Sequence, residues 1–292
     1  MNRAPLVLFA VLSFTTSTAC RRGDSNKRGE RAAAELPPLA VPSPTAGLTV
    51  SGFGDAVVAL PVGATKPRPV LVAVLGIGDT PEDQCATWRD IVGVRAFVLC
   101  PRGAKHMVQE ELDAGEPGTA DDQEDSPEED KPSARPDSGR FRQVGFYPVD
   151  VATLDREVSA GLSALKARYG AHVSEGNVVY AGFSRGAFLG ASLALKRPAL
   201  LRRLVLIEGG HSPWQAEAAT TFARGGGQRV LFLCGQPQCV EDAERAAAAL
   251  RGSKLDARVV HGEGEGHGYR KQVKEELRRN FDWVIEGDPT WQ

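Results

Sequence analysis

Hydrophobic and polar positions alternate along the chain in blocks that predict strands and helices in turn. Six short runs are almost wholly apolar, as is typical of parallel strands buried on both faces. Two longer stretches, 151–169 and 273–284, instead carry apolar residues every three or four positions, which predicts amphipathic helices. This alternation predicts a mostly parallel sheet of the α/β class. The six predicted strands are 70–75, 96–99, 178–181, 204–207, 230–233 and 257–260.

One pentapeptide, Gly182-Phe183-Ser184-Arg185-Gly186, joins the predicted strand at 178–181 to a helical segment at 187–195. The pattern G-x-S-x-G is common by chance, but between a strand and a helix it predicts a nucleophile elbow. Small neighbours let the strand and helix pass closely while the serine hydroxyl projects from the turn. Ser184 is therefore the predicted nucleophile. His267 lies in the glycine-rich loop 262–268, between the last predicted strand and the terminal helix, where it is the predicted general base.

With serine first and histidine last, the chain resembles the α/β-hydrolases from roughly Leu48 to Trp291. The resemblance implies an α/β-hydrolase fold, a twisted, mostly parallel sheet with helices on both faces. It also implies a serine hydrolase with a Ser-His-acid triad and an acyl-enzyme intermediate. Two backbone amides should form the oxyanion hole. One is that of Arg185, and for the other Ile77 is preferred, with Gly78 next, although the turn 76–79 lacks the His-Gly pair of many relatives.

Two carboxylates compete for the role of the acid. The family usually places it shortly after the strand that here ends at Leu233, where this chain has Gln238. Asp242 follows a little later, at a position typical of a first helical turn, where the helix dipole favours negative charge. Glu208 follows the preceding strand, at the sheet edge where ligands bind in open α/β sheets. Glu208 is preferred, and Asp242 remains the alternative.

The N-terminus predicts export. Residues 1–19 have the charge, apolar stretch and small final residues of a signal peptide. Cys20 then resembles the lipid-attachment cysteine of bacterial lipoproteins, although Ser17 replaces the usual leucine, and ordinary cleavage after Ala19 is the alternative. Residues 20–47 are predicted to form a disordered tether, and residues 48–292 are predicted to form the hydrolase domain.

Four further cysteines predict two disulfides, which an exported chain can keep oxidised. Cys85 and Cys100 flank one helix-to-strand unit, and Cys234 and Cys239 are separated by four residues. The pairing leaves Cys20 alone, which favours its lipid modification. An acidic insertion at about 109–140 is predicted to be disordered, because residues 110–140 hold twelve acidic against three basic side chains.

Charge and motifs exclude other classes of function. The net charge of −2 comes without a basic stripe, which argues against nucleic-acid binding. The sequence has no run of about 20 apolar residues, and no phosphate loop, dinucleotide fingerprint or zinc-ligand spacing, so neither cofactor nor metal is expected. The sequence thus predicts an exported, lipid-anchored, carboxylesterase-like enzyme of the cell envelope acting on a small acyl ester. The alternatives are a peptidase-like hydrolase and a non-catalytic envelope binding protein on the same scaffold.

Overall fold

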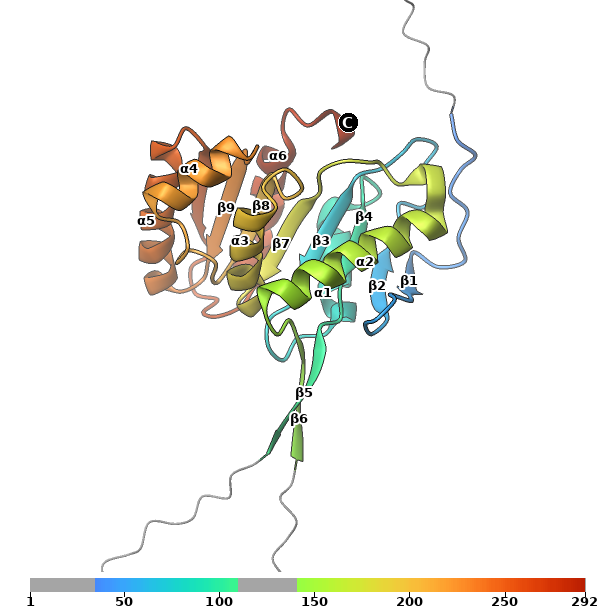
Figure 1. Ribbon diagram of the computed structural model, residues 1–292, viewed down its shortest axis with the longest axis horizontal. Helices are drawn as coiled ribbons and strands as arrows, with labels where there is room; N and C mark the ends of the chain where they lie inside the picture. The colour runs from blue at the N-terminus through green and yellow to red at the C-terminus, as the bar shows by residue number, and fades with distance from the viewer. Residues whose placement is uncertain (1–34, 110–140, 292) are drawn as a thin grey trace, which may run out of the picture. The chain divides into compact units, whose positions relative to one another are not determined.

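An eight-stranded sheet organises the computed structural model, which describes residues 35–109 and 141–291 (Figure 1). From β4 to β10 all five pairings between neighbouring strands are parallel, whereas β1 and β2 pair antiparallel at one edge. All six predicted strands are confirmed. In spatial order the strands are β1 (Thr45–Leu48), β2 (Ala56–Ala59), β4 (Phe97–Cys100), β3 (Val70–Val74), β7 (Val179–Phe183), β8 (Arg203–Ile207), β9 (Arg229–Cys234) and β10 (Asp256–His261).

Helices cover both faces of this sheet, as Figure 1 shows. Strand β3 illustrates why two cores form: Leu71 and Ala73 join one apolar cluster, whereas Val72 and Val74 join the other. The first cluster includes side chains of α1 (Pro81–Val92) and α6 (Gln272–Ile285). The second includes side chains of α2 (Val151–Tyr169), α3 (Arg185–Lys196), α4 (Ala216–Arg224) and α5 (Pro237–Gly252). There are also two short 3₁₀ helices in the described residues, Gly170–His172 and Pro289–Trp291.

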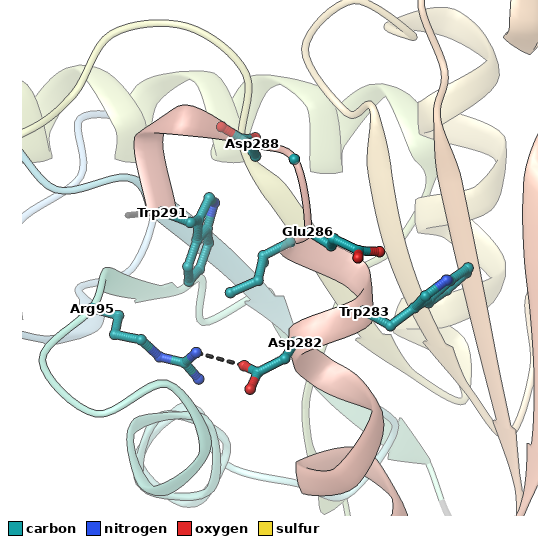
Figure 2. A pocket seen from close by; sticks show the side chains of 8 residues that line it. Arg95, Asp282, Trp283, Glu286, Asp288 and Trp291 are labelled. Atoms are coloured by element: carbon teal, nitrogen blue, oxygen red, sulfur yellow. Dashed lines mark hydrogen bonds and ion pairs between the residues drawn. The ribbon is translucent and has the colours of Figure 1, made fainter.

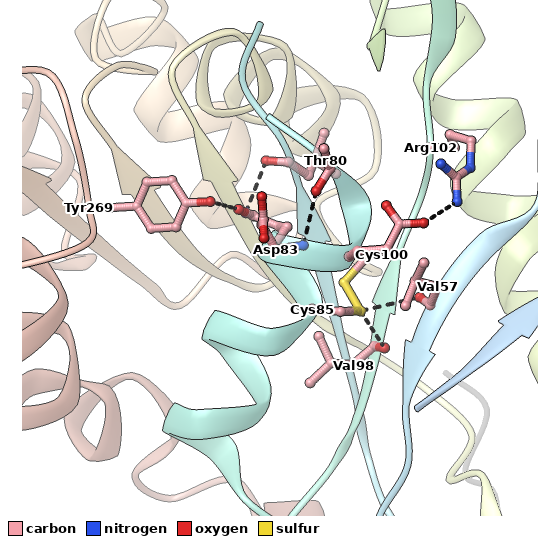
Figure 3. The surroundings of a disulfide bond; sticks show 11 residues. Val57, Thr80, Asp83, Cys85, Val98, Cys100, Arg102 and Tyr269 are labelled. Carbon is pink, nitrogen blue, oxygen red and sulfur yellow. Dashed lines mark hydrogen bonds and ion pairs between the residues drawn. A yellow bond between two sulfur atoms is a disulfide. The ribbon is translucent and has the colours of Figure 1, made fainter. Parts of the chain in front are cut away.

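Both predicted disulfides are present. Cys85 of α1 is bonded to Cys100 at the end of β4, and Figure 3 shows this bond with its surroundings. Thr80 caps α1 beside it by accepting a hydrogen bond from the Asp83 amide at 3.1 Å. Cys234, the last residue of β9, is bonded to Cys239 in the first turn of α5. Each bond therefore ties the end of a strand to a helix.

Two parts of the chain differ from the predicted organisation. Residues 35–47, assigned to the tether, contact the domain: the Leu36 amide donates to Thr65 O at 2.8 Å, and Leu39 is buried. A two-stranded antiparallel sheet, β5 (Ala104–Gln109) with β6 (Phe141–Tyr147), flanks the acidic insertion and was not predicted. Residues 110–140 themselves lie outside the described residues.

Both ends of this β5–β6 hairpin are held by side chains of the domain. The carboxylate of Glu157, buried on α2, accepts a hydrogen bond from the Gly103 amide at 2.9 Å. Just after β6, the Arg185 guanidinium donates a hydrogen bond to Val149 O at 2.6 Å. Burial raises the pKa of Glu157, although hydrogen bonds from the Gly103 and Arg102 amides oppose the shift. The ionised form of Glu157 is therefore disfavoured in the folded protein.

This raised pKa predicts a pH-dependent effect of Glu157→Gln, which removes the charge but keeps an oxygen that can accept from Gly103. A carboxyl group with a raised folded-state pKa contributes stability that is fully present below its unfolded-state pKa, about 4.3. That stability is lost as the pH rises through the folded-state pKa. In urea unfolding, the free energy of unfolding of the variant relative to wild type should therefore rise between pH 4 and pH 8. A fall over this range would contradict the assignment.

Candidate active site

Ser184 lies in a strained turn between β7 and α3. Its φ of 49° and ψ of −113° are rare for a residue with a side chain, a strain that costs on the order of 1–3 kcal/mol and persists at functional sites. The turn is tight because a Cβ on Gly186 would lie 2.4 Å from Val74 O, and one on Gly182 would lie 2.6 Å from Gly186 O. The Ser184 amide donates to Ile207 O at 2.8 Å, which fixes the turn to β8.

His267 approaches Ser184 from the loop between β10 and α6. Its Nε2 atom lies 3.0 Å from Ser184 Oγ, within hydrogen-bond distance. The imidazole packs against the ring of Phe183, the residue before the serine, with the ring centroids 5.2 Å apart. The structure thus brings together two side chains that are 83 positions apart in the sequence.

Glu208 lies behind the histidine, directly after β8. Its Oε2 atom is 3.3 Å from His267 Nδ1, and its side chain is only 1% exposed. The other oxygen, Oε1, accepts hydrogen bonds from the amides of Gly235 and Gln236, the latter at 3.3 Å. Glu208 also has a positive φ of 52°, which turns the chain sharply at the end of the strand. Serine, histidine and carboxylate therefore form one continuous chain of polar contacts.

Asp242, the alternative acid, has other partners. It accepts hydrogen bonds from Arg245 and from Gln238, the latter at 3.3 Å. Its second oxygen lies 4.0 Å from Nδ1 of His211, not of His267. The geometry therefore favours Glu208 over Asp242 as the partner of His267.

The two residues predicted for the oxyanion hole both belong to segments that adjoin the serine. Arg185 follows it as the first residue of α3, where amides point away from the helix and carry partial positive charge. Ile77 follows Gly76, and a Cβ on Gly76 would lie 3.1 Å from Ser184 Cβ. Both residues thus belong to backbone segments next to the serine, as an oxyanion hole at this turn requires.

Comparisons with known proteins bear on this architecture. No protein-family model and no curated protein matches the sequence. Among solved structures, TT1662 from Thermus thermophilus superposes with a TM-score of 0.50 at 18% identity, over 83% of this chain and 98% of that chain. Est1E from Butyrivibrio proteoclasticus gives 0.52 at 10% identity, over 83% and 99% of the two chains. An uncharacterized protein from Bacillus cereus gives 0.51 at 13% identity, over 76% and 61%.

The chain has the α/β-hydrolase fold. Its eight-stranded, mostly parallel sheet with helices on both faces agrees with these neighbours and with the fold expected from the sequence. In this α/β-hydrolase fold, the predicted site residues meet at the carboxyl edge of the parallel strands. The turn with Ile77 follows β3, Ser184 follows β7, Glu208 follows β8 and His267 follows β10.

The histidine loop has supports that the sequence analysis missed. Glu265 holds the loop to the start of α6, since its carboxylate accepts from the amides of Arg270, Lys271 and Val273, the last at 2.6 Å. Tyr269 packs its ring on Phe183, with centroids 4.6 Å apart. Contacts of this kind have no short sequence signature, because the partners come from different elements.

Tyr269 also links the histidine loop to the turn that carries Ile77. Its hydroxyl lies within hydrogen-bond distance of Asp79, at 3.2 Å, and of Gln84 on α1 (Figure 3). Arg270 forms an ion pair with the same Asp79, at 3.4 Å. Burial raises the pKa of Asp79 despite these partners, and burial likewise raises the pKa of Tyr269. The base and one side of the predicted oxyanion hole are therefore fixed to each other.

A separate pocket of about 550 Å³ lies at the carboxyl-terminal end of α6 (Figure 2). Arg95 and Asp282 form an ion pair of 2.6 Å at its side. The predicted site residues are not among those lining this pocket, and α6 leads away from the histidine loop toward it. We therefore place the candidate active site at Ser184, not in this pocket.

Other sequence predictions concern features away from this site. Cys20, the predicted lipid-attachment site, lies outside the described residues. Within the described residues, three or more His, Cys, Asp and Glu side chains are nowhere grouped so that they could hold a metal ion. In that same part of the chain, every helix is too short or too polar to cross a membrane.

Proposed function

We propose that the protein is a serine hydrolase that cleaves acyl esters. Ser184 Oγ attacks the ester carbonyl while His267 Nε2 takes its proton, and the amides of Arg185 and Ile77 bind the oxyanion. Collapse of this intermediate expels the alcohol, which receives the proton from His267 and leaves an acyl-Ser184 ester. Water, deprotonated by His267, then hydrolyses that ester. Glu208 orients the imidazole and stabilises its charged form.

The observation that carries this proposal is the contact chain from Ser184 to His267 to Glu208. A serine at a strained elbow is a weak nucleophile without a base, and His267 Nε2 at 3.0 Å supplies one. The base in turn needs a third group to fix its orientation, and Glu208 lies at its other nitrogen. The fold alone does not imply the activity, so the proposal depends on this local geometry.

A fluorophosphonate probe tests the nucleophile directly, because it reacts covalently with activated serines. Wild-type protein should be labelled, whereas Ser184→Ala should be unlabelled and His267→Ala should react at least ~100-fold more slowly, as expected when a triad member is lost. Ser192→Ala, which changes a serine elsewhere on α3, is the matched control and should react like wild type. Equal labelling of Ser184→Ala and wild type would refute the assignment. A wild type that is not labelled and does not hydrolyse esters would favour a binding protein on a hydrolase scaffold.

The acid is tested by two amide substitutions. Glu208→Gln should lower kcat on a simple acyl ester by at least ~100-fold, a conservative figure beside the ~10⁴-fold loss known for comparable triads. KM should change little, because the acid acts on the imidazole rather than on bound substrate. Asp242→Asn should change kcat less than ~5-fold, since its partners lie on its own helix and at His211. Circular dichroism controls for folding, and a crippled Asp242→Asn would transfer the role to that residue.

Two exposed apolar side chains near Ser184 support a proposal about the acyl group. Ile77 is 53% exposed beside the predicted oxyanion hole, and Phe188 is 45% exposed in the first turn of α3. Side chains on a helix lean toward its N-terminus, so Phe188 covers the turn that begins at Ser184. Water-exposed apolar area next to the nucleophile favours an acyl chain that can cover it. We therefore propose substrates with an apolar acyl group.

Chain-length dependence tests this proposal. Phe188→Ser should lower kcat/KM for an octanoyl ester by about 5- to 10-fold, the effect of losing one or two buried methylene contacts. It should leave kcat/KM for the acetyl ester within about twofold of wild type. Val94→Ser is the matched control: Val94 is also exposed but precedes β4, at the opposite edge of the sheet. An equal loss on both esters would show that Phe188 does not contact the acyl chain.

A further inference from the structure

The carboxylate of Glu208 is held by a loop of a different strand. Glu208 follows β8, but the two amides that its Oε1 atom accepts from, Gly235 and Gln236, follow β9. Gln236 is the N-cap of α5, and its side chain makes no capping hydrogen bond. The position of its backbone therefore depends on how the short loop between β9 and α5 is held at its two ends. The orientation of the acid therefore depends on how firmly residues 235 and 236 are fixed.

A disulfide closes this loop at both ends. Cys234 immediately precedes Gly235, and Cys239 lies in the first turn of α5, three residues after Gln236. Both half-cystines are buried in the core beneath the helices α2 to α5. The bond thus ties the last residue of β9 to the start of α5 across the two amides that hold Glu208.

The same loop also contacts the segment that carries the base. A Cβ on Gly235 would lie 2.3 Å from Gly266 O, the residue before His267, so the two backbones are in close contact. At the start of the histidine loop, the Gly262 amide donates to Cys234 O at 2.8 Å. The segment 234–236 therefore contacts both the acid and the loop of the base.

We propose that the Cys234–Cys239 disulfide is a positioning element for the catalytic acid. It holds the Gly235 and Gln236 amides against Glu208 Oε1, which turns Oε2 toward His267 Nδ1. The inference rests on the proposed function, because it assigns Glu208 as the acid. Without the bond, the peptides at 235 and 236 rotate more freely and Glu208 loses part of its fixed orientation.

The second disulfide supplies a matched control. Cys85–Cys100 closes a loop with a sequence separation of 15, against 5 for Cys234–Cys239. In the chain-entropy account, a longer closed loop restricts the unfolded chain more. If both bonds only stabilise the fold, loss of Cys85–Cys100 should therefore lower the free energy of unfolding at least as much as loss of Cys234–Cys239. If Cys234–Cys239 positions the acid, its loss should instead lower kcat more than loss of Cys85–Cys100 does.

Kinetics on the full-length oxidised protein separate the two roles. Cys234→Ala/Cys239→Ala should lower kcat on a short acyl ester by about tenfold or more, with KM within about threefold of wild type. Cys85→Ala/Cys100→Ala should keep kcat within about threefold of wild type. It should lower the melting temperature at least as much as Cys234→Ala/Cys239→Ala does. Glu208→Gln should cost far less in the Cys234→Ala/Cys239→Ala background than in wild type, because coupled residues are not additive. An equal cost in both backgrounds would overturn the proposal.

A second variant and a readout independent of activity complete the test. Gln236→Pro leaves both cysteines in place but deletes one amide that Glu208 accepts from, and it should also lower kcat with little change in KM. By proton NMR, a downfield signal from His267 Nδ1–H bonded to a carboxylate should be present in wild type and in Cys85→Ala/Cys100→Ala. It should be lost in Glu208→Gln and broadened by exchange in Cys234→Ala/Cys239→Ala.

The NMR signal also distinguishes the two failures. If wild type shows the signal but neither hydrolyses esters nor reacts with the probe, the proposed function fails, while exchange broadening of the signal in Cys234→Ala/Cys239→Ala would still support positioning. If wild type is active and the signal and kcat both survive loss of Cys234–Cys239 in a folded variant, the positioning role is refuted and the hydrolase proposal stands.

Discussion

Ser184 is held at a positive φ between β7 and α3, and the geometry of the candidate site depends on this one turn. The turn forms because Gly182 and Gly186 have no Cβ where the backbones of the elbow and of β3 pass closely. Strain of this kind persists only when the surrounding structure over-determines it. Here the surroundings are a mostly parallel sheet, whose buried strand β7 ends immediately before the serine.

The sheet also explains why residues far apart in sequence meet. Parallel strands all end at the same edge, so the residues that follow β3, β7, β8 and β10 converge there without any local signal linking them. Each group still needs its own support: backbone amides for Glu208, and Glu265 with Tyr269 for the histidine loop. The site is therefore built from rigid strand ends and from loops tied to one another.

Much of this could be predicted because buried parallel strands are continuously apolar and the elbow has a distinct pattern. The pairing of Cys234 with Cys239 was predicted from their spacing, Ser184 from the elbow pattern between a strand and a helix, and His267 from its loop after the last strand. Strands β1 and β2 were not predicted: both are short, and in β1 the polar Thr45 and Gly47 interrupt any apolar run. The support of Glu208 could not be predicted, since amides of Gly235 and Gln236 have no side-chain signature. The contact between Tyr269 and Asp79 spans 190 positions and needs the folded chain.

In the proposed function, Glu208 after β8 is the acid, and Gln238 stands where the α/β-hydrolases usually have theirs. The loop after β9 is then free to supply amide donors, and Gly235 suits this use because a side chain there would collide with Gly266 O. A buried carboxylate needs such donors, since an unpaired charge in the interior is costly. In the proposed function, the loop after β9 thus fixes the carboxylate of the neighbouring strand instead of providing one itself.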